Sequence, residues 1–302
     1  MVKCSSCPAK FDSGEELADH LQDAHSIEFF GLTVLQRFRL KRHLHISEGC
    51  VVFESGVHKD EVVVKIARSH HGQQELDNEH LLLSEDLKGC LGVPVILAYA
   101  SLVPGGQCAQ KILVTSPLGK PIKLCFDDNK NERSILAERL SRQLCDILRS
   151  VHTCGVLHRD IKPDNLMGSF TSPEDLTLID FGSAIRISQV ASAEPFGTPH
   201  YLAECFRETG LASYRGDFES AAWSMHALEV GWREYEKEDP QSKLDSRPPI
   251  EEVAQCSLAV STLMCAAPRS DQRPRRMGLM IWCVASLFIA LTLSTFRGIG
   301  TT

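Results

Sequence analysis

Short apolar runs separated by turns mark the first part of the chain, at residues 51–53, 62–66, 94–97 and 111–115. The first two runs are rich in valine, and the Gly-Val-His-Lys-Asp segment at 56–60 between them is typical of a turn. Branched residues bounded by turns are typical of strands, because their side chains pack well on a pleated surface. We therefore predict a β-rich region here.

Helical spacing of apolar residues dominates the rest of the chain. Residues 73–83 place Leu76 and Leu83 on one face of a predicted helix, and 134–153 carry apolar residues at helical intervals. The pattern stays mainly helical beyond Asp217. Strands that precede helices in this way predict an α+β fold, with a small β-rich lobe ahead of a larger helical lobe.

Composition divides the chain into regions. Residues 1–26 are polar and rich in Cys and His, 44–276 have the texture of a globular domain, 277–296 carry no charge, and we interpret 27–43 as a linker. The formal net charge of −7 argues against a protein that coats nucleic acid or an anionic membrane. No apolar leader opens the chain, and its 12 cysteines form no compact framework. We therefore expect a protein that faces the reducing cytosol, with cysteines that are mostly thiols or metal ligands.

Two polar motifs carry the candidate chemistry. The octapeptide His-Arg-Asp-Ile-Lys-Pro-Asp-Asn occupies 158–165, and Asp-Phe-Gly begins fifteen residues after Asn165, behind an apolar run at 176–179. Phosphoryl transfer needs a lysine on the phosphates, metal-binding Asp and Asn residues, and an Asp beside the acceptor hydroxyl. The alternative is a charged surface loop, which does not explain eight consecutive matches followed by the second motif.

These motifs resemble those of the eukaryotic protein kinase superfamily, over residues 44–276. The resemblance implies a bilobal protein kinase fold that uses ATP and Mg²⁺. It also implies that Asp160 accepts or orients the proton of the acceptor hydroxyl, while Lys162 steadies the transferred phosphoryl group. Asn165 and Asp180 would hold the magnesium.

The expected partner of the phosphates is Lys65, which ends the second valine run. A glutamate on the following helix should pair with this lysine. We prefer Glu79 to Glu75, which lies one turn earlier on the same helix face. Taken alone, each of these residues could be an ordinary solvated charge, and only their order along the chain favours a shared role.

The motifs resemble Ser/Thr kinases, and among these the casein kinase I group. Lys162-Pro163 and Gly197-Thr198 are of the Ser/Thr kind, so protein substrates with Ser or Thr hydroxyls are implied. Thr198 is then expected to bond Asp160 and Lys162. Three segments are similar to those of the casein kinase I group: 92–94, 113–119 and 217–220.

The similarity to these segments also implies which residues surround the nucleoside of ATP. Thr115 would be the gatekeeper, and Ser116 and Leu118 would offer backbone groups to adenine. Val63 stands where the family usually has a small alanine above the base. Asp217 would brace the backbone of the catalytic loop.

The glycine-rich loop departs from the family pattern. The candidate segment 47–54 keeps only the middle glycine, Gly49, as a phosphate-binding residue, and Glu48 adds a negative charge beside it. Fewer glycines leave the backbone less free to approach phosphates. The Ala-Pro-Glu motif is also reduced, at 202–204. These losses leave a second hypothesis open, a catalytically weak pseudokinase or scaffold.

The amino-terminal region has the spacing of a two-Cys, two-His zinc finger with a ββα fold. Phe11 and Leu17 fall where such fingers place their core. We expect four side chains to bind a structural Zn²⁺: Cys4, Cys7, His20 and His25. The base-reading positions would be Ser13, Glu16 and Asp19, and two of these are acidic. We therefore expect a finger that binds protein, with DNA binding unlikely, and keep a nucleic-acid-binding regulator as a third hypothesis.

The uncharged segment 277–296 is long enough to cross a bilayer. Arg273, Arg275 and Arg276 precede it and only Arg297 follows, which favours a tail anchor with the kinase region in the cytosol. The alternatives are a buried last helix of the kinase lobe, or a mis-assigned carboxyl terminus. In those cases the protein would be soluble, in the cytoplasm or the nucleus.

Overall fold

The computed structural model describes most of the predicted kinase region. It covers residues 2–3, 10–11, 38, 40–57, 60–102, 110–126, 130–169, 175–192, 196–237, 239–240, 242 and 246–268. The four predicted zinc ligands and the predicted membrane segment 277–296 lie outside the described residues.

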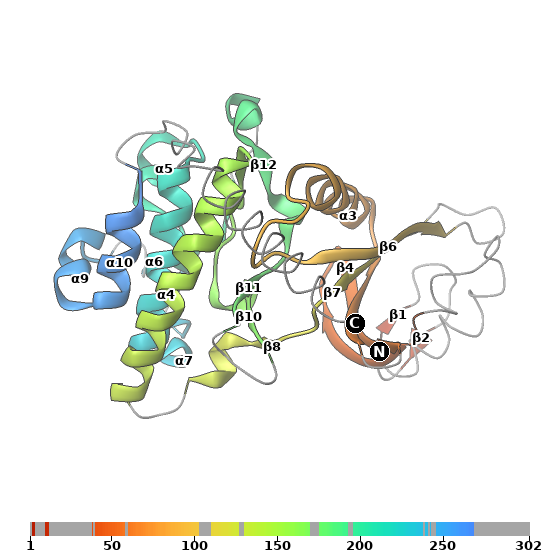
Figure 1. Cartoon of the computed structure of the whole chain (residues 1–302), viewed down its shortest axis with the longest axis horizontal. Coiled ribbons are helices and arrows are strands. Elements are labelled where there is room, and N and C mark those ends of the chain that lie inside the picture. The colour runs from red at the N-terminus through yellow and green to blue at the C-terminus, as the bar shows by residue number, and fades with distance from the viewer. Residues whose placement is uncertain are drawn as a thin grey trace, which may run out of the picture.

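A five-stranded antiparallel sheet forms the first lobe, in the order β3-β4-β5-β7-β6 (Figure 1). Its strands are β3 (Leu40–Ile46), β4 (Cys50–Val57), β5 (Asp60–Ala67), β6 (Val95–Leu102) and β7 (Gln110–Ser116). The four predicted strands are confirmed, and each is longer than its apolar run because the pairing continues through the neighbouring residues.

The sheet starts earlier than composition predicted. Leu40 is buried and pairs with Ser55 of β4, and Phe38 just ahead of it is buried as well. Residues 40–43 therefore belong to the sheet rather than to a linker. Composition misplaced the boundary because β3 is an edge strand rich in Lys, Arg and His, and charged side chains are typical of strands with a free edge.

Helix α3 (His70–Leu81) packs against the sheet and confirms the helix predicted at 73–83. It begins three residues earlier than expected because Ser69 caps it, its hydroxyl accepting a hydrogen bond from the Gly72 backbone at 3.1 Å. A single π-helical turn, Leu82–Asp86, prolongs it.

The second lobe is helical, and its core lies where α4, α6 and α10 pack together (Figure 1). Trp223, Leu144 and Leu263 are among the fully buried residues of this core. The helices are α4 (Lys130–Thr153), α5 (Glu204–Thr209), α6 (Tyr214–Val230), α7 (Trp232–Tyr235), α9 (Ile250–Cys256) and α10 (Leu258–Ala266). The prediction of a β-rich lobe ahead of a helical lobe is thus confirmed.

Short strands between the lobes hold the two motifs. The octapeptide at 158–165 connects β9 to β10, and Asp-Phe-Gly connects β11 to β12. These strands pair as β11-β10-β8 and β12-β9, so the two motifs are brought side by side. Their bounds are β8 (Lys120–Pro121), β9 (Val156–Leu157), β10 (Leu166–Gly168), β11 (Thr177–Leu178) and β12 (Ile185–Arg186).

At the amino terminus, β1 (Val2–Lys3) pairs with β2 (Lys10–Phe11) in an antiparallel hairpin. Within the described residues, no group of three or more His, Cys, Asp or Glu side chains is arranged to hold a metal ion. Among the same residues, no helix has the length and apolar character needed to cross a membrane.

Candidate active site

The catalytic loop is fixed from behind by a buried carboxylate. Asp217, in the first turn of α6, accepts hydrogen bonds from the backbone N–H groups of His158 and Arg159, each at 2.9 Å. The ring of His152 contacts the same carboxylate at 2.8 Å. Burial alone would raise the pKa of Asp217, but the hydrogen bond and charge of His152 outweigh burial and lower it. Asp217 therefore stays ionised and holds the backbone that carries Asp160.

Three side chains form a closed hydrogen-bonded triangle at the front of the loop. Lys162 Nζ donates to Asp160 Oδ2 at 2.7 Å and to Thr198 Oγ1 at 3.0 Å. The Thr198 hydroxyl in turn donates to Asp160 Oδ1 at 2.6 Å. The resemblance had implied the two bonds of Thr198, and the Lys162–Asp160 bond adds to them. Together they fix both oxygens of the largely buried Asp160 carboxylate.

Asn165 ties the two motifs together. Its Nδ2 donates to the backbone oxygen of Asp160 at 2.8 Å, and its backbone oxygen accepts the N–H of Ile179 at 2.9 Å. Because Ile179 immediately precedes Asp180, the Asn165 and Asp180 side chains come from neighbouring stretches of backbone. The amide oxygen of Asn165 points away from the bonds that its nitrogen makes.

Lys65 contacts the glutamate predicted to pair with it and, in addition, the predicted magnesium ligand Asp180. Its Nζ lies 2.7 Å from Glu79 Oε2 on α3 and 3.1 Å from Asp180 Oδ1. Burial would lower the pKa of Lys65, but the Asp180 and Glu79 carboxylates overcome it and raise the pKa. The lysine charge in turn lowers the pKa of Asp180. Glu75, the alternative partner, instead lies 3.7 Å from His71.

Asn78 of α3 is a residue that sequence reasoning missed. Its Nδ2 lies 3.3, 2.9 and 2.8 Å from the backbone oxygens of Phe181, Gly182 and Ala184. Asp180 itself has left-handed backbone dihedrals, φ 71° and ψ 69°, and 49% of its side chain is exposed. Asn78 thus links α3 to the Asp-Phe-Gly turn and helps to fix the backbone that follows Asp180. No local sequence pattern signals such a contact.

The segment predicted as a glycine-rich loop is a tight hairpin turn. The backbone N–H of Ser47 donates to the oxygen of Cys50 at 2.9 Å, which closes the turn between β3 and β4. Gly49 packs directly on Gly72 of α3, so closely that a Cβ on Gly72 would lie 1.9 Å from the Gly49 oxygen. The Arg68 backbone N–H also donates to that oxygen at 2.7 Å. The hairpin tip therefore rests on the start of α3.

The expected nucleoside end lies on the sheet face that carries Lys65. Val63 is two residues before Lys65 in β5, and it pairs with Thr115 at the end of β7. The chain then continues through Ser116 and Leu118 toward the second lobe. The structure thus places the predicted adenine-binding residues around one end of the face and Lys65 further along it.

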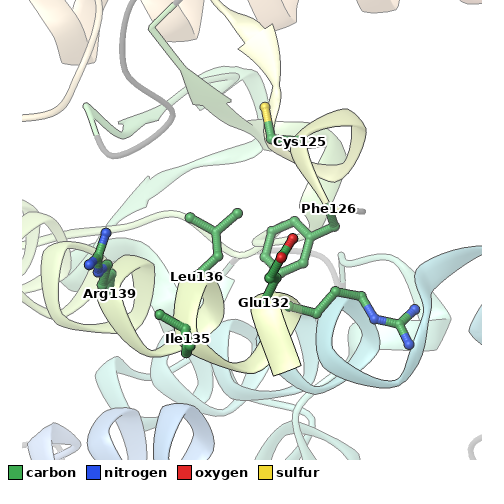
Figure 2. Close-up of a pocket in the computed structure, with 7 residues that line it drawn as sticks. Cys125, Phe126, Glu132, Ile135, Leu136 and Arg139 are labelled. Carbon is green, nitrogen blue, oxygen red and sulfur yellow. The ribbon is translucent and has the colours of Figure 1, made fainter. Parts of the chain in front are cut away.

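A separate cavity of about 230 Å³ lies in the helical lobe. Figure 2 shows Phe126, Glu132 and Leu136 around it, at the start of α4. None of the predicted site residues lines this cavity, so it is not the candidate active site.

Comparison with known proteins places the fold and the two motifs in one family. The model of the protein kinase domain matches residues 105–272, more than half of the chain. The chain therefore belongs to the protein kinase family. It is similar to the solved structure of vaccinia related kinase 3, with a TM-score of 0.56, 14% identity, and coverage of 91% of this chain and 96% of that one.

Curated relatives are similar at modest identity. A putative cyclin-dependent kinase F-2 of rice is 31% identical over 145 residues, which are 45% of this chain and 43% of that protein. A serine/threonine-protein kinase stk11 homolog of Dictyostelium discoideum is 30% identical over 208 residues, 67% of this chain and 30% of that protein. The matches thus span less than half of each relative's length.

The residues present fit the ATP and Mg²⁺ that a protein kinase fold implies. Magnesium prefers oxygen ligands and is usually held by one or two carboxylates plus substrate phosphates. The half-exposed Asp180 carboxylate and the free amide oxygen of Asn165 supply such ligands, and Lys65 supplies a positive charge beside them.

Proposed function

We propose that the protein is an active serine/threonine protein kinase that transfers the γ-phosphoryl group of ATP to Ser or Thr hydroxyls of proteins. The observation that carries the proposal is the Lys162–Asp160–Thr198 triangle, set beside the Lys65–Asp180 ion pair. Proton acceptor, phosphate-binding cation and metal-binding carboxylate are then assembled in one cleft.

The residues divide the work as follows. Asp160 accepts or orients the proton of the substrate hydroxyl, because Lys162 and Thr198 fix both of its oxygens. Lys162 stabilises charge that develops on the transferred group. Lys65, oriented by Glu79, binds the phosphates of ATP.

Other residues bind ATP and Mg²⁺ on either side of the Lys162–Asp160–Thr198 triangle. Asn165 and Asp180 bind Mg²⁺, which neutralises phosphate charge when it is bound. Val63 covers the base, and the backbone groups of Ser116 and Leu118 bind its edge. Gly49, the one glycine kept from the glycine-rich pattern, contributes its backbone to phosphate binding.

Several features support the Ser/Thr preference and a relation to the casein kinase I group. Lys162-Pro163 and the Thr198 bond to Asp160 are of the Ser/Thr kind, and the Dictyostelium discoideum relative is named as a serine/threonine-protein kinase. The Asp217 contacts to the loop backbone agree with the role implied by the casein kinase I resemblance.

The test is phosphate transfer from ATP to a generic protein substrate in the presence of Mg²⁺. Asp160→Asn should abolish transfer, and removing Mg²⁺ with a chelator should abolish it in the wild type. Asp164→Asn is the matched control, because Asp164 lies in the same loop but pairs with Lys123. Equal incorporation by wild type and Asp160→Asn would disprove the proposal.

One observation favours a second candidate, a pseudokinase or scaffold. The hairpin tip rests on α3 through the Gly49–Gly72 contact, where a kinase loop would cover phosphates. Thermal unfolding with and without millimolar MgATP separates the two candidates. No stabilisation by the nucleotide would favour the scaffold, because a ligand that binds the folded state must raise its stability.

For the amino terminus we propose a structural zinc finger that binds a protein partner. Its support is the spacing of Cys4, Cys7, His20 and His25, together with the β1–β2 hairpin. One zinc per chain in the wild type, lost in Cys7→Ser, would support it. Salt-dependent binding to duplex DNA that disappears in Cys7→Ser would instead support a nucleic-acid-binding regulator.

For the carboxyl-terminal part we propose a membrane anchor at 277–296, with the kinase region, 44–276 extended back to 40, facing the cytosol. Its support is the absence of charge over 277–296 and the excess of arginine before it. The test is fractionation of cells that express the full chain. Recovery in the soluble cytoplasmic or nuclear fraction would disprove the anchor.

A further inference from the structure

Two rows of paired residues cross the sheet on the side of the cleft. The first row consists of Arg42, Glu54, Val63 and Thr115. The second row consists of His45, Val52, Lys65 and Leu113. Directly paired residues share a face of the sheet, and so do residues two apart along a strand. Arg42 and Glu54 therefore lie on the same face as Lys65.

The rows cover different ends of the cleft. Lys65 of the second row reaches Asp180, so that row lies over the phosphate end. Thr115 of the first row is followed at once by Ser116 and the connection to the second lobe, so the first row lies over the nucleoside end. In the first row only Val63 presents an aliphatic side chain. The members of this row on β3 and β4, Arg42 and Glu54, are both charged.

Arg42 and Glu54 form an ion pair with a defined geometry. The Nε of Arg42 lies 3.1 Å and its Nη2 2.9 Å from the same oxygen of Glu54, Oε2. The Arg42 side chain is 65% exposed and that of Glu54 only 16%. One carboxylate oxygen therefore holds one edge of the guanidinium, while most of the arginine side chain stays exposed.

A guanidinium held in this way suits a purine. Its plane stacks on aromatic rings and attracts their π electrons, which an ammonium on a flexible stem does less well. Glu54 neutralises the arginine and fixes its orientation, so little side-chain freedom remains to be lost on binding.

This inference rests on the proposed function. We propose that the Arg42 guanidinium, oriented by Glu54, stacks on the adenine ring of ATP and forms the roof of the nucleoside site at β3 and β4. Arg42 is then a nucleotide-binding residue, and Glu54 is a positioning residue that acts through it.

The test is calorimetric titration of the full chain with adenosine and, separately, with MgATP. Arg42→Ala and Arg42→Lys should each weaken adenosine binding by about fivefold or more, and MgATP binding by a similar factor. The double variant Arg42→Leu with Glu54→Val should bind within about threefold of the wild type, because an aliphatic roof replaces the stacked one. Arg149→Ala, an exposed arginine of α4, is the control and should change neither affinity.

Three results would overturn the inference. Unchanged adenosine affinity in Arg42→Ala would show that the arginine does not contact the base. Full affinity in Arg42→Lys would show that charge suffices without a planar group. Weaker MgATP binding with unchanged adenosine binding would place Arg42 on the phosphates. If Arg42→Ala fails to fold, Arg42→Lys decides, because a lysine still pairs with Glu54.

The wild type separates this inference from the proposed function. Wild-type protein that binds MgATP and transfers phosphate, with Arg42 variants indistinguishable from it, would overturn the stacking role alone. Wild-type protein and double variant that both fail to bind adenosine and MgATP at millimolar concentration would overturn the two proposals together. Binding by the double variant alone would show that the ion pair opposes the nucleotide, which also overturns the stacking role.

Discussion

The two sides of the cleft differ in how closely they keep the family pattern. On the lower side, formed by the catalytic loop, Asp160, Lys162 and Asn165 are all present, and each is fixed by at least one hydrogen bond of 3.0 Å or less. On the upper side, formed by the five-stranded sheet, the segment predicted as a glycine-rich loop makes a tight turn on Gly72, and Arg42 and Glu54 form a charged pair.

The difference follows from what each side has to supply. The lower side must place particular atoms, a proton acceptor and metal-binding oxygens, at fixed positions, and few residue types offer those atoms. The upper side must supply contact area and shape around a base and its phosphates. Different side chains can provide area. We therefore expect substitution of the functional atoms of the catalytic loop to affect chemistry, and substitutions on the upper side, apart from Lys65, to affect nucleotide binding or stability.

The largest effect is expected at Lys65, the upper-side residue whose charge is proposed to act on the phosphates. Lys65→Met should lower kcat/KM by roughly 10²–10³-fold, the usual cost of losing a group that stabilises developing charge. The measurement is steady-state phosphate transfer, normalised to folded protein. Lys111→Met in β7 is the control, because Lys111 is partly exposed and pairs with Asp77. Similar losses in both variants would contradict the assignment.

The second-largest effect is expected at Asp217, which supports the backbone of the catalytic loop. Asp217→Asn should reduce the free energy of unfolding by about 3 kcal/mol at pH 7, because two buried N–H groups and His152 lose their carboxylate. Denaturant unfolding of the wild type and the variant measures the difference. Asp146→Asn, an exposed residue of α4, should have little effect.

The same carboxylate predicts a pH dependence with a definite sign. The pKa of Asp217 is lowered in the folded protein, so its contribution is present above the ordinary aspartate pKa of about 4 and is lost as pH falls through the folded-state value. The stability gap between wild type and Asp217→Asn should therefore be constant near neutral pH and shrink in acid. A gap that grows as pH falls would contradict this account.

A smaller effect is expected at the contact between the hairpin and α3. Gly72→Ala should destabilise the protein by about 2 kcal/mol, because its Cβ would overlap the Gly49 oxygen and force the hairpin away. Helix propensity alone would favour alanine by about 1 kcal/mol. Thermal unfolding measures the sign. Gln74→Ala, on the exposed face of the same helix, shows the effect of propensity without the overlap.

The smallest effect is expected at Asn78, which links α3 to the Asp-Phe-Gly turn. Asn78→Leu should cost about 1 kcal/mol of stability, because backbone oxygens of the Asp-Phe-Gly turn lose their donor. Phosphate transfer should fall several-fold as Asp180 becomes less well oriented. Asn78→Asp, which keeps the shape but places a negative charge against those oxygens, should be worse than Asn78→Leu. Equal behaviour of the two variants would show that the amide donor is not what matters.

Some features could be predicted because their residues are close in the sequence or fixed by spacing. The octapeptide at 158–165 places Asp160, Lys162 and Asn165 within one loop, so their neighbourhood follows from chain connectivity alone. The Lys65–Glu79 pair follows from a strand that leads directly into a helix, with Glu79 fourteen positions after Lys65.

Other features could not be predicted. Asn78 meets Phe181 across 103 residues, and Gly72 meets Gly49 through the packing of a helix on a hairpin turn. Composition also placed the start of the sheet too late, because β3 has the polar surface of an edge strand.

The sequence by itself determined the order of the lobes, the catalytic motif and its family, because these depend on periodicity and on residue types at short spacing. Only the tertiary structure decided which face of the sheet Arg42 and Glu54 occupy, and that the hairpin rests on α3. Strand register fixes the first and close backbone packing fixes the second. Both depend on contacts between segments whose separation in the sequence carries no signal.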